Sequence, residues 1–227
     1  MKKISNRSSR KLEHTMLRDE RVTDFIALTD SDAQAPGGGS VAALVAALGA
    51  ALDNMVIHLS HGKKAYENLD DTVRAEIEAA VRANTAANAR LAKMIDRDAE
   101  SFGAVLAAYK LPKTTDEEKK TRDAAIRRGY EEAMRVPFAI AEEARDALVR
   151  SGIFARYGTK TALTDVAVGT IFLEAAIDAA LWNVIANLHG VDKETRTRAE
   201  EKIMEIRSEA HAVKEETLAL VRERLEV

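Results

Sequence analysis

Cysteine is absent from this chain of 227 residues, which also has only 3 prolines and few aromatic side chains, 4% of the total. Its absence excludes disulfides, thiolate metal ligands and a cysteine nucleophile. This composition fits a reducing compartment, and we expect a cytoplasmic protein. No segment alternates polar and apolar residues convincingly, so the sequence also lacks the pattern of a half-buried β-strand.

Neither sign of charge predominates. Lysine and arginine number 34 against 37 aspartates and glutamates, which leaves a formal net charge of -3 and no basic field for a nucleic acid. Residues 1–20 are basic but lack the apolar stretch of a signal peptide, and we treat them as an N-terminal extension. The apolar run over residues 41–59 contains Asp53, Asn54 and His58, which favours a core helix over a membrane span.

Alanine, leucine and the charged helix-forming residues dominate the chain and predict an all-α protein. A capping box at Thr115 and Glu118 predicts one helix start, Asp192 caps another, and Pro137 should kink the helix that contains it. The expected fold is a single domain over residues 1–227, an up-and-down bundle of five to six long helices. We expect helices over residues 11–28, 40–58, 71–110, 115–152, 164–190 and 192–227.

Two of these segments, residues 40–58 and 164–190, are apolar on most faces. All-round apolarity predicts that both helices lie at the centre of the bundle. A single layer of outer helices covers such segments poorly, so we expect a homodimer that buries part of them. The alternative is a monomer in which the outer helices suffice.

The stretch PGGGS, residues 36–40, leads into the first of these apolar helices. Gly37, Gly38 and Gly39 let backbone approach a ligand closely, and the free N–H groups of a helix N-terminus favour anionic or carbonyl oxygens. The stretch matches neither the dinucleotide fingerprint nor the P-loop. The alternative is a flexible turn in which Ser40 caps the helix.

A second motif, HLSHGKKAY, follows the same helix. Gly62 can adopt the left-handed conformation that ends a helix, and Lys63 and Lys64 then face the negative end of the helix dipole. One lysine suffices for that role, which leaves a positive charge for an acidic ligand. His58 and His61 are spaced as half of a metal site, but no carboxylate at matching helical spacing completes it, so we predict none.

Polar residues on two helices are further candidates. Asp165 and Asn183 project from the same face of the segment 164–190, with Asn187 about 40° away, but the first two lie about 27 Å apart along the axis. They therefore cannot both touch one reacting atom. The asparagines could equally bond neighbouring helices, and Asp165 could simply face its own helix dipole. Asp98 lies nearest the apolar stripe of its helix, so we expect partial burial and a raised pKa.

These stretches, together with DRDAESFGAVLAAYKLPKTTDEEKKTR, TDVAVG and NVIANL, occur in an order that resembles the cyclodeaminase/cyclohydrolase family. That family comprises the C-terminal domain of formimidoyltransferase-cyclodeaminase and stand-alone relatives, which include methenyltetrahydrofolate cyclohydrolases. The resemblance covers about residues 22–192. It implies an all-helical, commonly dimeric protein with a folate site beside the glycines. The chain departs from the family at Ser60, where threonine is usual, and in its basic N-terminal extension.

The resemblance implies hydrolysis of 5,10-methenyltetrahydrofolate to 10-formyltetrahydrofolate, with the folate as substrate and no separate cofactor. Asp165 is then the first candidate for the catalytic carboxylate and Asp98 the second, with Lys63 as proton donor or orienting cation. Lys64 would meet the glutamate tail. The pterin or the tail would be held by Gly37, Gly38, Gly39 and Ser40, and a pterin edge by Asn183 or Asn187.

Two other functions stay open. Cyclodeamination of 5-formimidoyltetrahydrofolate, which releases ammonia, needs the same acid and base. The chain contains no formimidoyltransferase segment, which favours the cyclohydrolase, although a separate formimidoyltransferase could act as a partner. The third alternative is a non-catalytic folate-binding or assembly protein.

Overall fold

The structure is a computed structural model that describes residues 16–227. The first residues of the predicted helix 11–28, and most of the basic extension, lie outside this range. The described residues form seven α-helices and three short 3-10 helices, without a strand. The α-helices are α1 (Val22–Thr29), α2 (Gly38–His58), α3 (Lys64–Glu67), α4 (Asp71–Tyr109), α5 (Asp116–Tyr157), α6 (Leu163–Asn187) and α7 (Lys193–Leu225). The 3-10 helices are η1 (Leu17–Asp19), η2 (Lys160–Ala162) and η3 (Leu188–Gly190).

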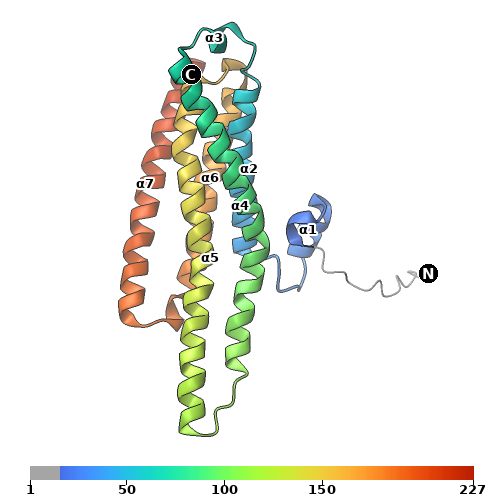
Figure 1. Cartoon of the computed structure of the whole chain (residues 1–227), viewed down its shortest axis with the longest axis vertical. Coiled ribbons are helices and arrows are strands. Elements are labelled where there is room, and N and C mark those ends of the chain that lie inside the picture. Colours follow the sequence, from blue (N-terminus) through green and yellow to red (C-terminus); the bar gives the residue numbers. More distant parts are fainter. Residues whose placement is uncertain (1–15) are drawn as a thin grey trace, which may run out of the picture.

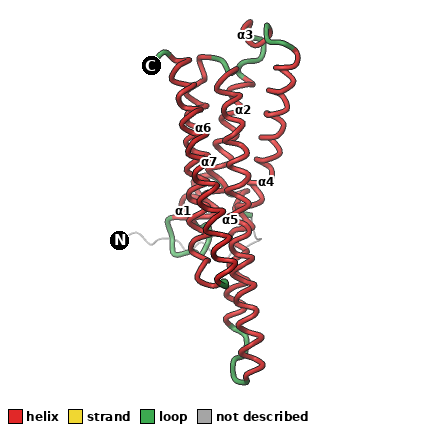
Figure 2. The backbone as a smooth tube through the Cα atoms, turned by 90° about the vertical axis from the view of Figure 1, so that its left-hand side faces the viewer, coloured by secondary structure: helices red, strands yellow, loops and turns green. Residues whose placement is uncertain are grey.

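Five long helices run up and down along one axis (Figure 1). Helix α2 packs against α4 and α6, α5 packs against all three, and α7 lies against α5 and α6. The hairpin between α4 and α5 extends beyond the other helices at one end, while the short α3 lies at the opposite end (Figure 2). The predicted all-α, up-and-down bundle is confirmed.

Local signals placed several helix ends correctly. The Thr115 hydroxyl accepts a hydrogen bond from the Glu118 N–H, and the Glu118 carboxylate accepts one from the Thr115 N–H, so the predicted capping box is confirmed. Asp192 caps α7 by accepting from the Thr195 N–H at 2.8 Å. Gly62 has a φ of 75°, the left-handed conformation predicted after α2. In each case the hydrogen bonds or dihedral angles involve only neighbouring residues.

Three predicted boundaries are wrong. The segment predicted as one helix over residues 11–28 is α1, which begins at Val22, preceded by the separate 3-10 helix η1. Ser40 does not cap α2, which begins at Gly38 with Gly37 as its N-cap. The Ser40 hydroxyl instead donates to the Ile95 carbonyl of α4 at 2.7 Å. Gly152 does not end α5, which continues to Tyr157 and is followed by Gly158. A Cβ on Gly158 would lie 2.5 Å from Cγ1 of Val56, so packing against α2 requires glycine at this later position.

Glycines also set the contact between α2 and α6. A Cβ on Gly49 would lie 2.9 Å from the Gly169 carbonyl oxygen, and a Cβ on Gly169 would lie 2.9 Å from the Gly49 oxygen. The two backbones therefore approach more closely than any other residue pair would allow. Leu173 and Ile177 of α6 are buried in the core beside this crossing.

The sequence predicted that α2 and α6 lie at the centre and that a homodimer buries part of them; within one subunit, neither helix is covered on all faces. Helix α5, despite its many charged residues, is the one that contacts α2, α4, α6 and α7. The most apolar windows of α2 and α6 are only 56% and 44% buried, although by length and composition both helices could cross a membrane. Each leaves large apolar side chains exposed, namely Leu48, Met55 and Leu59 on α2, and Val168, Ile171, Phe172 and Trp182 on α6.

Candidate functional site

A polar cleft of about 140 Å³ lies at the N-terminal end of α2. It brings together five of the predicted site residues, from the start of α2, from α4 and from the end of α6. The cleft is lined by Gln34, Gly37, Gly38, Asp98, Ala99, Ser101, Ala133, Pro137, Asn183 and Asn187.

The Asp98 carboxylate lies directly against the first turn of α2. A Cβ on Gly39 would meet Asp98 Oδ1 at 2.0 Å, so only glycine permits this approach. The Ser40 N–H donates to the carboxylate, and the Ser40 hydroxyl, which donates mainly to the Ile95 carbonyl at 2.7 Å, lies 3.4 Å from Oδ2. The protein's own carboxylate therefore occupies the helix N-terminus at which the sequence predicted a ligand.

Asp98 has the electrostatic character of an acid–base group. Burial raises its pKa above the ordinary value, and the hydrogen bonds from Ser40 offset part of that rise. The carboxyl group is thus easier to protonate than an exposed aspartate while it still faces the cleft. Gly39 and Ser40 are buried beneath it and do not line the cleft themselves, so their predicted contact with a ligand stays a prediction.

The two asparagines of α6 reach the cleft with one side of their amide groups already engaged. Asn183 Nδ2 donates to the Ala179 carbonyl at 2.8 Å, and Asn187 Nδ2 donates to the Asn183 carbonyl at 2.8 Å. Asn183 also sets the contact with α2, since a Cβ on Gly38 would lie 3.2 Å from its Nδ2. These bonds engage the Nδ2 donor of each amide, and the amide oxygens are acceptors for an N–H group.

Lys63, Lys64 and Asp165 lie at the opposite end of α2. Lys63 Nζ donates to Thr159 Oγ1 at 2.9 Å and to Thr161 Oγ1 at 3.2 Å. Asp165 is in the first turn of α6, next to this region, and Lys64 begins α3. A helix of 21 residues is about 30 Å long, so within one subunit these groups cannot reach the atom that Asp98 reaches.

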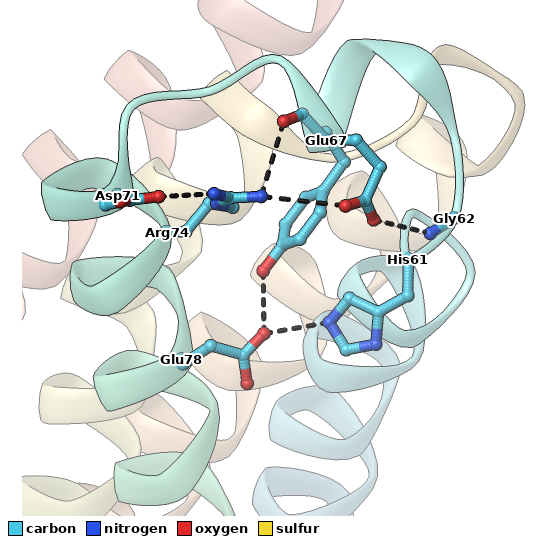
Figure 3. A network of polar contacts seen from close by, with 7 residues as sticks. His61, Gly62, Glu67, Asp71, Arg74 and Glu78 are labelled. Atoms are coloured by element: carbon cyan, nitrogen blue, oxygen red, sulfur yellow. Dashed lines mark hydrogen bonds and ion pairs between the residues drawn. The ribbon is translucent and has the colours of Figure 1, made fainter.

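A network of polar contacts holds the segment that carries the two lysines (Figure 3). Glu78 of α4 accepts from the Tyr66 hydroxyl at 2.6 Å and bonds the His61 ring at 2.8 Å. Glu67 accepts from the Gly62 N–H at 2.9 Å. The hydrogen bond from Tyr66, followed by those from His61, lowers the pKa of Glu78 below its ordinary value. The segment is therefore anchored by an ionised carboxylate that sequence analysis did not single out.

Sequence analysis also missed the far wall of the cleft. Ser101 extends the α4 side, and Ala133 and Pro137 supply the α5 side. None carries a chemical signature, because small and apolar wall residues resemble ordinary helix positions. Within residues 16–227, no group of three or more histidines, aspartates and glutamates is arranged to hold a metal ion.

The structure is thus that of an all-helical protein in which a partly buried carboxylate, that of Asp98, lines a polar cleft. Residues 21–205 match the family model described as formiminotransferase-cyclodeaminase. The chain belongs to this family, which confirms the resemblance described above.

Two relatives and one solved structure show how much of each protein is similar to this chain. The formimidoyltransferase-cyclodeaminase of Rattus norvegicus is 36% identical over 202 residues, which are 87% of this chain and 37% of that protein. The chain thus spans about a third of the length of such relatives. A methenyltetrahydrofolate cyclohydrolase of Methylorubrum extorquens is 34% identical over 92% of this chain and 100% of its own length. The crystal structure of a formiminotetrahydrofolate cyclodeaminase from Thermotoga maritima matches with a TM-score of 0.72 and 26% identity, over 91% of this chain and 96% of that one.

Proposed function

We propose that this protein hydrolyses 5,10-methenyltetrahydrofolate to 10-formyltetrahydrofolate. The observation that supports this most is the match to the Methylorubrum extorquens cyclohydrolase, which extends over the whole of that protein. The folate itself is the substrate, and the proposal includes no separate cofactor. We extend the proposal to a cytoplasmic location, on the cysteine-free composition alone.

The reaction requires one group that can take and return a proton. Water adds to the cationic carbon that bridges N5 and N10 while a base removes one of its protons. The tetrahedral intermediate then opens as the C–N5 bond breaks, N5 takes a proton, and the hydroxyl proton leaves for solvent as the formyl C=O forms. A carboxyl group with a raised pKa can deprotonate the water and protonate N5 in turn.

Asp98 fits this role better than Asp165, which the sequence ranked first. Asp98 lines the cleft and its pKa is raised, whereas Asp165 lies at the other end of α2. The Asp98 carboxylate would also favour the cationic substrate electrostatically. Asn183 and Asn187, whose amides are fixed on the wall of the cleft, would accept hydrogen bonds from the N–H groups of the pterin.

A homodimer would give Lys63, Lys64 and Asp165 a place in the same site. The exposed apolar residues of α2 and α6 include Leu48, which stands at the middle of α2, and Ile171, both 48% exposed. A two-fold axis perpendicular to the helices, through that apolar surface, would pair each helix with its copy in antiparallel orientation. The lysine end of one subunit would then approach the Asp98 cleft of the other.

Cyclodeamination is the second candidate, supported by the similarity to the structure of the Thermotoga maritima formiminotetrahydrofolate cyclodeaminase. N10 would attack the formimidoyl carbon on N5, and ammonia would leave from a similar tetrahedral centre. Asp98 could serve as acid and base here as well. In that case a separate formimidoyltransferase is the partner we would expect to supply the substrate. A third candidate is a bundle that binds folate without catalysis.

Turnover of the two folates by the purified protein tests the proposal. We expect hydrolysis of the methenyl compound, followed by its absorbance, well above the spontaneous rate. Asp98→Asn should abolish it, and Asp165→Asn and Lys63→Met should reduce it if the dimeric site forms. Ammonia release from the formimidoyl compound alone would transfer the assignment to cyclodeaminase. Folate binding without turnover of either compound would leave only the non-catalytic function.

A further inference from the structure

A second pocket, of about 340 Å³, lies beside the Asp98 cleft. The cleft and the second pocket are both lined by residues of α4 and α5 and by residues at or just after the end of α6. Ala133 of α5 lines the cleft and Tyr130, one turn earlier, lines the second pocket. Asn187 at the end of α6 lines the cleft, and His189 of η3 lines the second pocket. One helical turn is about 5.4 Å, so the pockets adjoin along the groove between α5 and the end of α6.

The size of the cleft shows why the neighbouring pocket matters. At about 140 Å³ the cleft is smaller than the usual range for small-molecule sites, about 300–1,000 Å³. A tetrahydrofolate has a pterin, a p-aminobenzoyl ring and a glutamate. The cleft has room for only part of such a molecule, whereas the two pockets together fall within the usual range.

Aromatic side chains form a fixed wall of the second pocket. The His189 ring bonds the Ala186 carbonyl through Nδ1 at 2.9 Å, which leaves Nε2 to accept from the Tyr130 hydroxyl at 3.0 Å. The Tyr109 and Tyr130 hydroxyls lie 3.3 Å apart. Gly190 packs directly against the Tyr130 ring, since a Cβ there would lie 1.9 Å from ring carbon Cδ2. Tyr130 is therefore held in place, while the half-exposed Tyr109 ring is accessible to a planar ligand.

Arg127 is the one arginine or lysine among the residues that line this pocket, which also include the carboxylates of Asp123 and Asp192. Hydrogen bonds from Thr195 engage Asp192, and with the Arg127 charge they lower its pKa. Asp123 lies 4.0 Å from the Arg122 guanidinium, which also stands over the Tyr109 ring at 5.3 Å. Arg127 lines the pocket, is exposed, and forms no ion pair with any residue from 16 to 227. The pocket thus offers an aromatic face and an available guanidinium, which suit an aromatic ring that bears a carboxylate.

We propose that the second pocket binds the p-aminobenzoylglutamate part of the folate, with its ring against Tyr109 and Tyr130 and a glutamate carboxylate on Arg127. This inference rests on the proposed function. The reacting carbon bridges N5 of the pterin and N10 of the p-aminobenzoyl group. When the pterin occupies the cleft, that carbon comes to the junction of the two pockets, where Ala133 and Asn187 line the cleft.

Binding of p-aminobenzoyl-L-glutamate, measured by calorimetry, tests the pocket without any turnover. Arg127→Met should weaken binding about tenfold or more, because it removes a charge-assisted hydrogen bond. Arg128→Met is the matched control, because Arg128 is the next residue of α5 and is exposed but does not line the pocket. Tyr109→Leu is a second variant that removes the aromatic face, and circular dichroism confirms the fold of each.

Kinetics then separate this inference from the proposed function. Arg127→Met should raise KM for methenyltetrahydrofolate with kcat unchanged, whereas Asp98→Asn should lower kcat and leave p-aminobenzoyl-L-glutamate binding unchanged. If Arg127→Met and Tyr109→Leu turn over the substrate with an unchanged KM, the proposed binding in the second pocket is wrong, whereas the proposed cyclohydrolase function still holds. Equal weakening by Arg127→Met and Arg128→Met also overturns it. If p-aminobenzoyl-L-glutamate binding depends on Arg127 but neither folate is turned over, the proposed binding in the second pocket is supported and the proposed cyclohydrolase activity is wrong.

Discussion

Gly39→Ala tests whether the close approach of α2 places the Asp98 carboxylate. The added Cβ would lie 2.0 Å from Asp98 Oδ1 and 2.4 Å from Cγ, whereas real Cβ contacts essentially never fall below 3.0 Å. The Cβ and the carboxylate must therefore move apart by about 1 Å, the difference between 3.0 and 2.0 Å. Because the backbone fixes the direction of Cβ, the strain cannot be relieved by turning the new methyl group, and either the carboxylate or the helix must move.

The effect on stability should be small. Alanine is favoured over glycine within a helix by about 0.5–1 kcal/mol, and overpacking costs about 1–3 kcal/mol. The free energy of unfolding should fall by about 0–2.5 kcal/mol as the net of the two. The effect on catalysis should be large, because a displacement of about 1 Å can reduce turnover about 100-fold. A folded protein with a much lower kcat is the expected result.

The assay combines kcat for methenyltetrahydrofolate hydrolysis with urea unfolding of the same preparations. Gly103→Ala is the matched control, because Gly103 is an exposed residue of α4 where an added Cβ meets nothing within 4 Å. It should leave kcat unchanged and raise the free energy of unfolding by about 0.5–1 kcal/mol. Full activity in Gly39→Ala would refute the argument that the glycine positions Asp98.

Three further predictions concern stability and titration. Burial raises the pKa of Asp53 well above its ordinary 3.8, so the folded protein binds this proton more tightly than the unfolded chain. The free energy of unfolding should therefore fall as the pH rises from about 3.8 toward the folded-state pKa, and Asp53→Asn should reduce this slope in urea titrations; parallel slopes would contradict it. Thr115→Ala should cost about 1 kcal/mol of stability by removing the capping box, and an equal loss in Thr114→Ala would contradict that cause. Burial, aided by Glu78, raises the pKa of Tyr66 to about 12. Glu78→Gln should lower that pKa in an ultraviolet titration, and an unchanged curve would exclude the contact.

The sequence by itself was enough to determine the five long helices and those ends that depend on neighbouring residues. Thr115, Asp192 and Gly62 act through bonds or dihedral angles within a few residues, so local chemistry predicts them. The separation of Asp165 from Asn183 also followed from helical rise alone. The folate family followed from resemblance and was confirmed by the family match.

The tertiary structure decided what depends on residues far apart in the chain. The Ser40 hydroxyl could cap its own helix or bond another one, and it donates a hydrogen bond to the Ile95 carbonyl, 55 residues away. The covered faces of α2 and α6 depend on where α5 packs, which an all-round apolar sequence does not specify. The glycine at residue 39 predicted a close approach, but only packing between α2 and α4 shows that Asp98 is what approaches.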